Sequence, residues 1–160
     1  MADNAVGRCR KHYLIVIFVK KILEKMTQKF KPTEEWLLQA EYDMDTAEAM
    51  FNSGRFIYAV FMIHLSLEKA VKAVYAQTYE DNPPKTHHLL YLIEKIQSKT
   101  IFDIPENILA PIREIDKISV PVRYPENLRE LAKDFTFETT SEIFTISKEV
   151  LLWLKSKLTL

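Results

Sequence analysis

The chain has 160 residues, of which 48% are apolar and 28% are charged, so we expect one globular domain around a single core. Only two glycines occur, which excludes a P-loop and a dinucleotide-binding fingerprint, because both need several closely spaced glycines. The formal net charge is zero, but residues 1–31 hold an excess of lysine and arginine. The rest of the chain is acidic, which argues against a protein that coats nucleic acid.

Residues 1–31 are expected to form a basic extension before a helical domain at residues 32–160. The apolar run of the extension is shorter than the roughly 20 residues that span a bilayer, so we expect no membrane segment. Met26 is an alternative translation start, in which case residues 1–25 lie outside the native protein. The only cysteine, Cys9, cannot form an intrachain disulfide, which fits a reducing cytoplasm.

A helical hairpin is expected at the start of the domain. Thr33 can cap a helix of about 20 residues, because acids follow it and apolar residues then recur every three or four positions. Residues 52–54 end this helix, and a short turn leads to a second, antiparallel helix from about Arg55. We expect the second helix to be central, because its apolar stripe is wide and includes Phe56, Val60, Ile63, Leu67, Val71 and Val74.

Two further helices are expected after the Pro83-Pro84 break. Thr86 can cap the third helix, and Asp103 and Glu106 have the spacing of a capping box for the fourth. Pro111 should kink or split the fourth helix. Residues 120–126 should be irregular, because a proline disfavours helical geometry in the residue before it.

The last helix is expected from about Thr136 to Lys157, with Phe137 and Ile146 among its inward apolar positions. No segment alternates apolar and polar residues over the length of a strand. The sequence therefore predicts an all-α fold, an up-and-down bundle of four to five helices.

Several short segments occur in a fixed order along residues 33–157. They are the Trp36, Ala40, Asp43, Ala47 pattern, the Gly54-Arg55 turn, Glu68-Lys69-Ala70-Val71-Lys72-Ala73, Thr86-His87-His88-Leu89 and Val122-Arg123-Tyr124-Pro125. In this order they resemble the HEPN domain family (higher eukaryotes and prokaryotes nucleotide-binding), whose members are small bundles of about five helices. The resemblance implies the same bundle here.

Many HEPN proteins are metal-independent ribonucleases, often toxins, with a histidine four to six residues after an arginine. In that chemistry the histidine moves protons at the ribose 2′-hydroxyl, and the arginine stabilises phosphate charge. Arg123 has no histidine after it, and Arg55 has His64 only nine positions later, so the motif is absent. An enzyme alternative stays open, in which Arg123 works with His64 or His87.

The Arg-Tyr-Pro segment resembles that of a prokaryotic branch of the family. Proteins of this branch are often encoded beside a minimal nucleotidyltransferase, which implies nucleotide binding or a role as partner subunit in a toxin–antitoxin-like pair. We therefore interpret the chain as a cytoplasmic nucleotide- or nucleic-acid-associated binding subunit. A purely structural, dimeric interaction module is another alternative.

Arg123 and Tyr124 are the first candidate ligand contacts. Arg123 could hold a phosphate, and Tyr124 could stack on a base. The alternative is that Arg123 pairs with an acid such as Glu126 while Tyr124 packs against the end of the bundle.

Lys69 and Lys72 are the second candidate ligand contacts, because side chains three residues apart on a helix can face one anion. The alternative is a solvated helix face with an exposed ion pair between Glu68 and Lys72. For His64 the two alternatives are a catalytic role and a structural one. A lone histidine on an apolar helix is more often buried and hydrogen-bonded than catalytic.

We expect neither a cofactor nor a metal ion, because His87 and His88 are adjacent and no cysteine or suitably spaced histidine joins them. A homodimer is expected, since Tyr58, Phe61 and Leu65 extend the apolar surface of the second helix beyond what one core needs.

Overall fold

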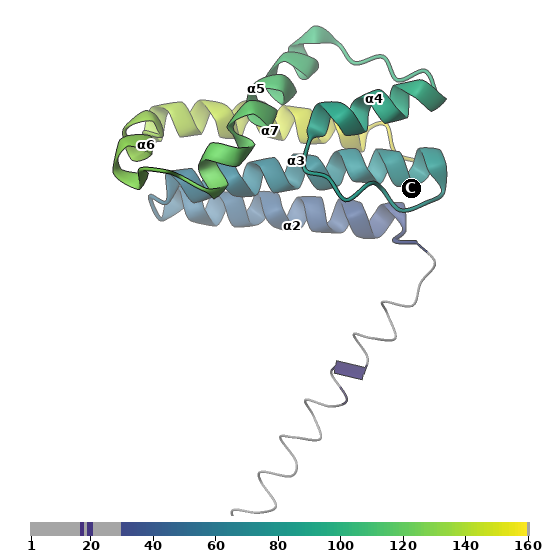
Figure 1. The fold of residues 1–160 in the computed structure, drawn as a ribbon, viewed down its shortest axis with the longest axis horizontal. Coiled ribbons are helices and arrows are strands. Elements are labelled where there is room, and N and C mark those ends of the chain that lie inside the picture. Colours follow the sequence, from purple (N-terminus) through teal and green to yellow (C-terminus); the bar gives the residue numbers. More distant parts are fainter. Residues whose placement is uncertain (1–16, 18, 21–29, 160) are drawn as a thin grey trace, which may run out of the picture. The chain divides into compact units, whose positions relative to one another are not determined.

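The computed structural model describes residues 17, 19, 20 and 30–159 (Figure 1). The chain divides into two compact units, residues 1–30 and 31–160, and the helical domain is the second. The described part of that domain contains no strand, and the predicted all-α class is confirmed. Cys9 and Met26 lie outside the described residues. The helices are α2 (Thr33–Asn52), α3 (Phe56–Tyr79), α4 (Leu89–Lys99), α5 (Glu106–Arg123), α6 (Leu128–Asp134) and α7 (Phe137–Lys155).

The α2 and α3 helices form the predicted antiparallel hairpin and lie side by side along their lengths (Figure 1). Their connection requires Gly54, whose φ of +72° lies in the left-handed region that other residues seldom adopt. The Arg55 N–H donates to the Met50 carbonyl oxygen at 2.8 Å and closes the turn. The turn therefore fixes where α3 begins.

The α3 helix is central, as predicted, because α2, α4, α5 and α7 all pack against it. Its apolar stripe includes Ile63, Leu67 and Val71, which are fully buried. Burial of each such side chain stabilises the fold by about 1.5–3 kcal/mol. A polar group on the same face of α3 as this stripe is therefore covered by other helices.

Side-chain caps are absent from two helix starts where the sequence predicts them. Pro32, rather than Thr33, occupies the N-cap of α2, and Pro105 occupies the N-cap of α5. Neither proline caps with a side chain, so the capping-box spacing of Asp103 and Glu106 is not used. Proline is tolerated at a helix start, where its missing N–H removes no helical hydrogen bond.

The α4 helix begins at Leu89, later than the predicted Thr86 cap. The Thr86 hydroxyl instead accepts from the His88 N–H at 3.2 Å. The Leu89 N–H donates to Asp116 Oδ1 at 2.8 Å. Because Asp116 belongs to α5, the cap of α4 comes from a distant part of the sequence, which local patterns cannot reveal.

The α5 helix is not split at either of its prolines, although the sequence predicts a kink or a split at Pro111 and an irregular segment from residue 120. It is one helix across Pro111, and it extends through Pro121 to Arg123, so the predicted irregular segment over residues 120–126 is wrong for its first half. Each proline removes one backbone donor. The neighbouring Ile112 and Val122 are buried, and that packing outweighs the loss.

The short α6 helix is missing from the sequence prediction. Its N-cap, Asn127, accepts from the backbone N–H groups of Arg129 and Glu130 at 3.1 and 3.3 Å. No residue of α6 is buried, so the helix has no apolar periodicity to detect. The available signal was Asn127 with Glu130 three residues later, a capping-box spacing.

The α7 helix agrees with the predicted last helix to within two residues at its end. Thr136 caps it as expected, since its hydroxyl oxygen accepts from the Thr139 N–H at 3.3 Å. The inward positions predicted for Phe137 and Ile146 are wrong, because both side chains are exposed at the edge of the stripe. Within the described residues, no helix has both the length and the apolar character to cross a membrane.

Candidate functional site

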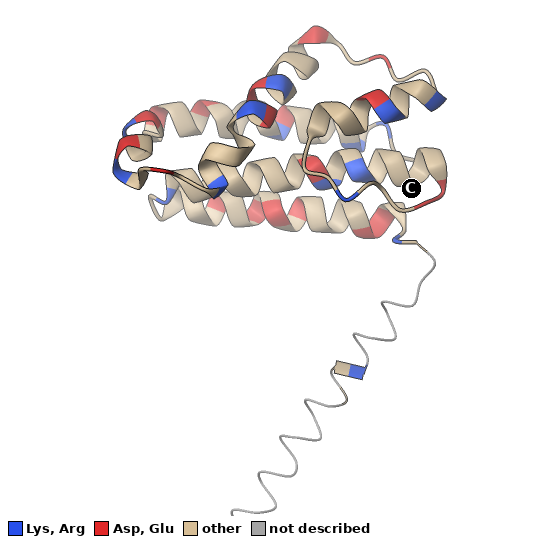
Figure 2. Ribbon diagram, viewed as in Figure 1, with Lys and Arg blue, Asp and Glu red and all other residues tan. Residues whose placement is uncertain are grey.

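Charge on α3 is confined to residues 68–72, which lie near the middle of the helix (Figure 2). The adjacent α2 carries acidic residues but no lysine or arginine. Glu68 is only 4% exposed and Lys72 is also buried. Since a buried charge is costly unless it is paired, partners from other elements are expected.

Three cationic or potentially cationic groups converge on the Glu68 carboxylate. Lys72 Nζ donates to Oε1 at 2.6 Å, and His87 Nδ1 lies 2.8 Å from Oε2. Arg123 Nη2 lies 3.6 Å from the same Oε2. We call Glu68, Lys72, His87 and Arg123, together with the adjoining His64 and Asp116, the Glu68 cluster.

The Glu68 cluster contradicts the predicted solvated face. Glu68 and Lys72 do form an i,i+4 pair, but α5 and the segment before α4 cover it. The local sequence could not show this, because the covering groups come from residues 19 and more positions away.

Arg123 is the last residue of α5 and points back into the bundle, contrary to the expected loop position. Its side chain is 13% exposed, and Nη2 lies 3.0 Å from His64 Nδ1. Its guanidinium also lies over the Phe61 ring, 5.4 Å from the centroid. No ion pair joins Arg123 to Glu126 among the described residues, so that alternative is not observed.

His64 is completely buried at the inner end of the cluster. Because arginine can only donate, His64 Nδ1 accepts from Arg123 and the ring proton lies on Nε2. Nε2 has no hydrogen-bond partner, and Asp116 Oδ1 is 3.9 Å away. Burial, followed by the charge of Arg123, lowers the pKa of His64 to about 4. His64 is therefore neutral and out of reach of a bound substrate.

His87 is the most exposed member of the cluster. Its side chain is 62% exposed, while Nδ1 is held by the buried Glu68 carboxylate. A carboxylate that accepts from one imidazole nitrogen fixes the ring orientation and leaves the other nitrogen for a ligand or a proton. The His87 imidazole is therefore placed to contact solutes at the surface.

Glu68 is ionised despite its surroundings. Burial opposes its ionisation, but the hydrogen bonds from Lys72 and His87 together outweigh burial and lower the pKa of its carboxyl group. The centre of the cluster is thus a buried negative charge held by surrounding donors.

Lys69 and Lys72 do not face one anion in this structure, because each has its own carboxylate. Lys69 pairs with Asp43, a buried residue of α2. Lys31 lies beside them, with Nζ 3.6 Å from the centre of the Trp36 ring. Burial is the main cause that lowers the pKa of Lys31, with the charges of Lys69 and Lys72 adding to it and Glu35 opposing.

Tyr124 lies outside the Glu68 cluster, although it follows Arg123 directly. Its side chain is 78% exposed, so it does not pack against the bundle end. Within the described part of the chain, no group of three or more histidine, cysteine, aspartate or glutamate side chains is placed to hold a metal ion.

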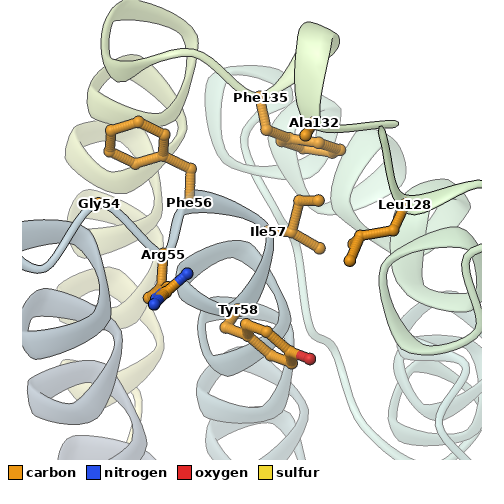
Figure 3. A pocket seen from close by; sticks show the side chains of 8 residues that line it. All are labelled: Gly54, Arg55, Phe56, Ile57, Tyr58, Leu128, Ala132 and Phe135. Atoms are coloured by element: carbon orange, nitrogen blue, oxygen red, sulfur yellow. The ribbon is translucent and has the colours of Figure 1, made fainter. Parts of the chain in front are cut away.

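A separate hollow of about 310 Å³ lies between the start of α3 and α6, and no candidate ligand-binding residue lines it. Figure 3 shows Ile57 and Leu128 pointing toward each other across it, with Phe135 and Ala132 on one side. Tyr58, one of the residues expected at a dimer interface, lies on the other side. The hollow is mainly apolar and is distinct from the Glu68 cluster.

Comparisons with known proteins give one family. A family model described as HEPN domain matches residues 33–157. No curated protein matches. The fold resembles that of TT1696 from Thermus thermophilus, with 21% identity, a TM-score of 0.67, and coverage of 79% of this chain and 98% of that one. It also resembles ST0689, an archaeal HEPN homologue, with 24% identity, a TM-score of 0.62, and coverage of 81% and 100%. At these sequence identities the two structures show the fold alone.

Proposed function

The chain belongs to the HEPN domain family, and from that premise we propose that it is a nucleotide- or nucleic-acid-binding subunit whose Glu68 cluster holds phosphate. The observation that carries the proposal is the convergence of Lys72, His87 and Arg123 on one small volume. These groups come from α3, from the segment before α4 and from the end of α5. Arginine, lysine and protonated histidine are the donors that recognise phosphate oxygens.

Two further residues fit a nucleotide beside such a phosphate site. Tyr124 is adjacent to Arg123 and exposes its ring, which could stack on a base. Lys69 is partly exposed next to the cluster, where a ligand phosphate would compete with Asp43 for its ammonium group. The base and the phosphate would then be held by neighbouring residues at the end of α5.

We propose that the protein acts in the cytoplasm beside a minimal nucleotidyltransferase, as one half of a toxin–antitoxin-like pair. The Arg-Tyr-Pro segment at residues 123–125 supports this branch of the family. The absent Arg-x4–6-His motif and the burial of His64 also favour a binding role over cleavage. Co-expression with the nucleotidyltransferase encoded by a neighbouring gene tests the partnership, and two proteins that elute separately would count against it.

A homodimer is the proposed assembly. Tyr58 is 54% exposed on α3, and Phe61 and Leu65 on the same helix are only partly buried. Apolar side chains of this size at a surface are typical of interfaces. Light scattering at tens of micromolar measures the mass directly, and a strict monomer would exclude this assembly.

Calorimetric titration with ATP and with a short single-stranded RNA tests phosphate binding. Replacing Arg123 by alanine should weaken binding at least about tenfold, because charge-assisted hydrogen bonds contribute about 1.5–3 kcal/mol each. Arg113→Ala is the matched control, since Arg113 lies on the same helix but pairs at the surface with Glu106. Equal losses in the two variants, or no binding by the native protein, would contradict the proposal and leave the structural module as the better account.

A metal-independent ribonuclease is the second candidate, and one observation favours it. Arg123 and the exposed His87 approach the same Glu68 oxygen, at 3.6 and 2.8 Å, although they are far apart in sequence. Such an imidazole could move a proton at a ribose 2′-hydroxyl while Arg123 stabilises phosphate charge. RNA cleavage in EDTA that both His87→Ala and Arg123→Ala abolish would establish this activity. Cleavage that persists in Arg123→Ala would indicate a contaminant.

A further inference from the structure

The Glu68 carboxylate stands where the donors of the proposed phosphate site converge. Lys72 occupies one of its oxygens, and His87 and Arg123 share the other. We propose that Glu68 is a built-in competitor, which an anionic phosphate ligand must displace from Lys72, His87 and Arg123. This inference rests on the proposed function, because it concerns how the same site is regulated.

The three donors have no other carboxylate to bind among the described residues. Lys72 Nζ otherwise lies 5.5 Å from the Trp36 ring centre, and Arg123 otherwise contacts the neutral His64 and the Phe61 ring. A phosphate that approaches the cluster therefore meets donors that are already neutralised. It meets their full positive charge only as Glu68 gives them up.

Displacement would leave Glu68 buried without its donors. A carboxylate in that position is driven to take up a proton, because an uncompensated buried charge is far costlier than a neutral acid. The proton comes from solvent and goes onto a Glu68 oxygen as the phosphate takes over the three donors. Ligand binding should therefore consume a proton, and affinity should rise as pH falls.

The charged groups around Glu68 come from identified elements. Lys72 lies on its own helix, His87 precedes α4, and Arg123 lies on α5. Asp116 of α5 faces His64 rather than Glu68, and the Asp43 of α2 is paired with Lys69. The ion pairs of α6 and α7 in the described chain do not involve the cluster. His87 is the other group whose proton could respond to a ligand, so the experiment must separate it from Glu68.

The test compares ATP binding by the native protein and by Glu68→Gln, which removes the charge and keeps the shape. Titrations in two buffers of different ionisation enthalpy give the number of protons taken up. We expect Glu68→Gln to bind ATP about tenfold or more tightly and to take up about one proton fewer at pH 7. Glu114→Gln is the matched control, because Glu114 pairs with Lys117 at the surface.

The outcomes separate this inference from the proposed function. If the native protein binds ATP and Glu68→Gln binds with equal or lower affinity, Glu68 is no competitor while the phosphate site stands. If the native protein does not bind ATP, both proposals fail, whatever Glu68→Gln does. Should Glu68→Gln not fold, proton uptake by His87→Gln decides, since the remaining uptake then belongs to Glu68, and its absence overturns the inference.

Discussion

Acid should destabilise this protein well before its carboxylates titrate, because His64 is buried as a neutral base. The perturbation is a fall in pH from 7 to 5. The pKa of His64 is about 4 in the folded chain and about 6.5 in the unfolded chain, so between these values the unfolded chain binds more protons. Stability therefore rises with pH across this window, is complete above about pH 6.5, and is lost as the pH falls toward 4.

The magnitude follows from the same two values. At about 1.4 kcal/mol for each pH unit, the full difference between 6.5 and about 4 corresponds to about 3 kcal/mol, of which about 2 kcal/mol is lost between pH 7 and pH 5. His64 has no exposed surface, so solvent screening does not reduce this figure. The pKa of Glu68 is lowered below its ordinary 4.5, so its own contribution is lost only at more acidic pH.

Urea unfolding at pH 7 and pH 5 measures the effect, in the native protein and in His64→Gln. The native protein should lose about 2 kcal/mol more than the variant over this interval. His88→Gln is the matched control, because His88 is exposed and should leave the pH dependence unchanged. Equal pH dependence in the native protein and in His64→Gln would show that His64 is not the titrating group.

Three further substitutions test the packing that holds the site. Lys72→Met should reduce the free energy of unfolding by about 3 kcal/mol, because it breaks a buried pair with Glu68. Lys117→Met at the surface should have little effect, and urea melts of the two variants measure the difference. Asp116→Ala should cost about 1 kcal/mol through the lost cap on the Leu89 N–H, and hydrogen exchange should rise at the start of α4 but not elsewhere. Gly54→Ala should cost about 1 kcal/mol from its positive φ alone, because no atom lies within 4 Å of an added Cβ; a larger loss in thermal melts would point to a clash instead.

The bundle could be predicted because its signals are local. The apolar repeats of α2 and α3 and the Gly54 turn between them lie within a few residues of each other in sequence, and each agrees with the structure. Predictions failed where distant packing overrides a local rule, as at Pro121, where burial of Val122 keeps the helix intact. The α6 helix was missed for a different reason, since none of its residues is fully buried and it shows no periodic apolar pattern.

The candidate site could be predicted by residue but not by arrangement. Arg123, Lys72, His64 and His87 all follow from the sequence, and the structure gathers them around Glu68. The role of Glu68 could not be predicted, because its donors come from three separate elements. The ligand-binding roles of Arg123, Lys72, Tyr124 and Lys69 all remain predictions, and Tyr124 and Lys69 do not join the Glu68 cluster.

The most direct test of the phosphate site is the nuclear magnetic resonance of the histidine side chains during titration with ATP. His87 lies in the Glu68 cluster, while the adjacent His88 has no contact with Glu68, so the two imidazoles form an internal comparison. We predict that the His87 ring signals shift in a saturable manner while those of His88 stay unchanged, and that Arg123→Ala abolishes the shift. Saturable binding that shifts neither His87 nor another residue of the Glu68 cluster would place the ligand elsewhere and exclude the proposed phosphate site.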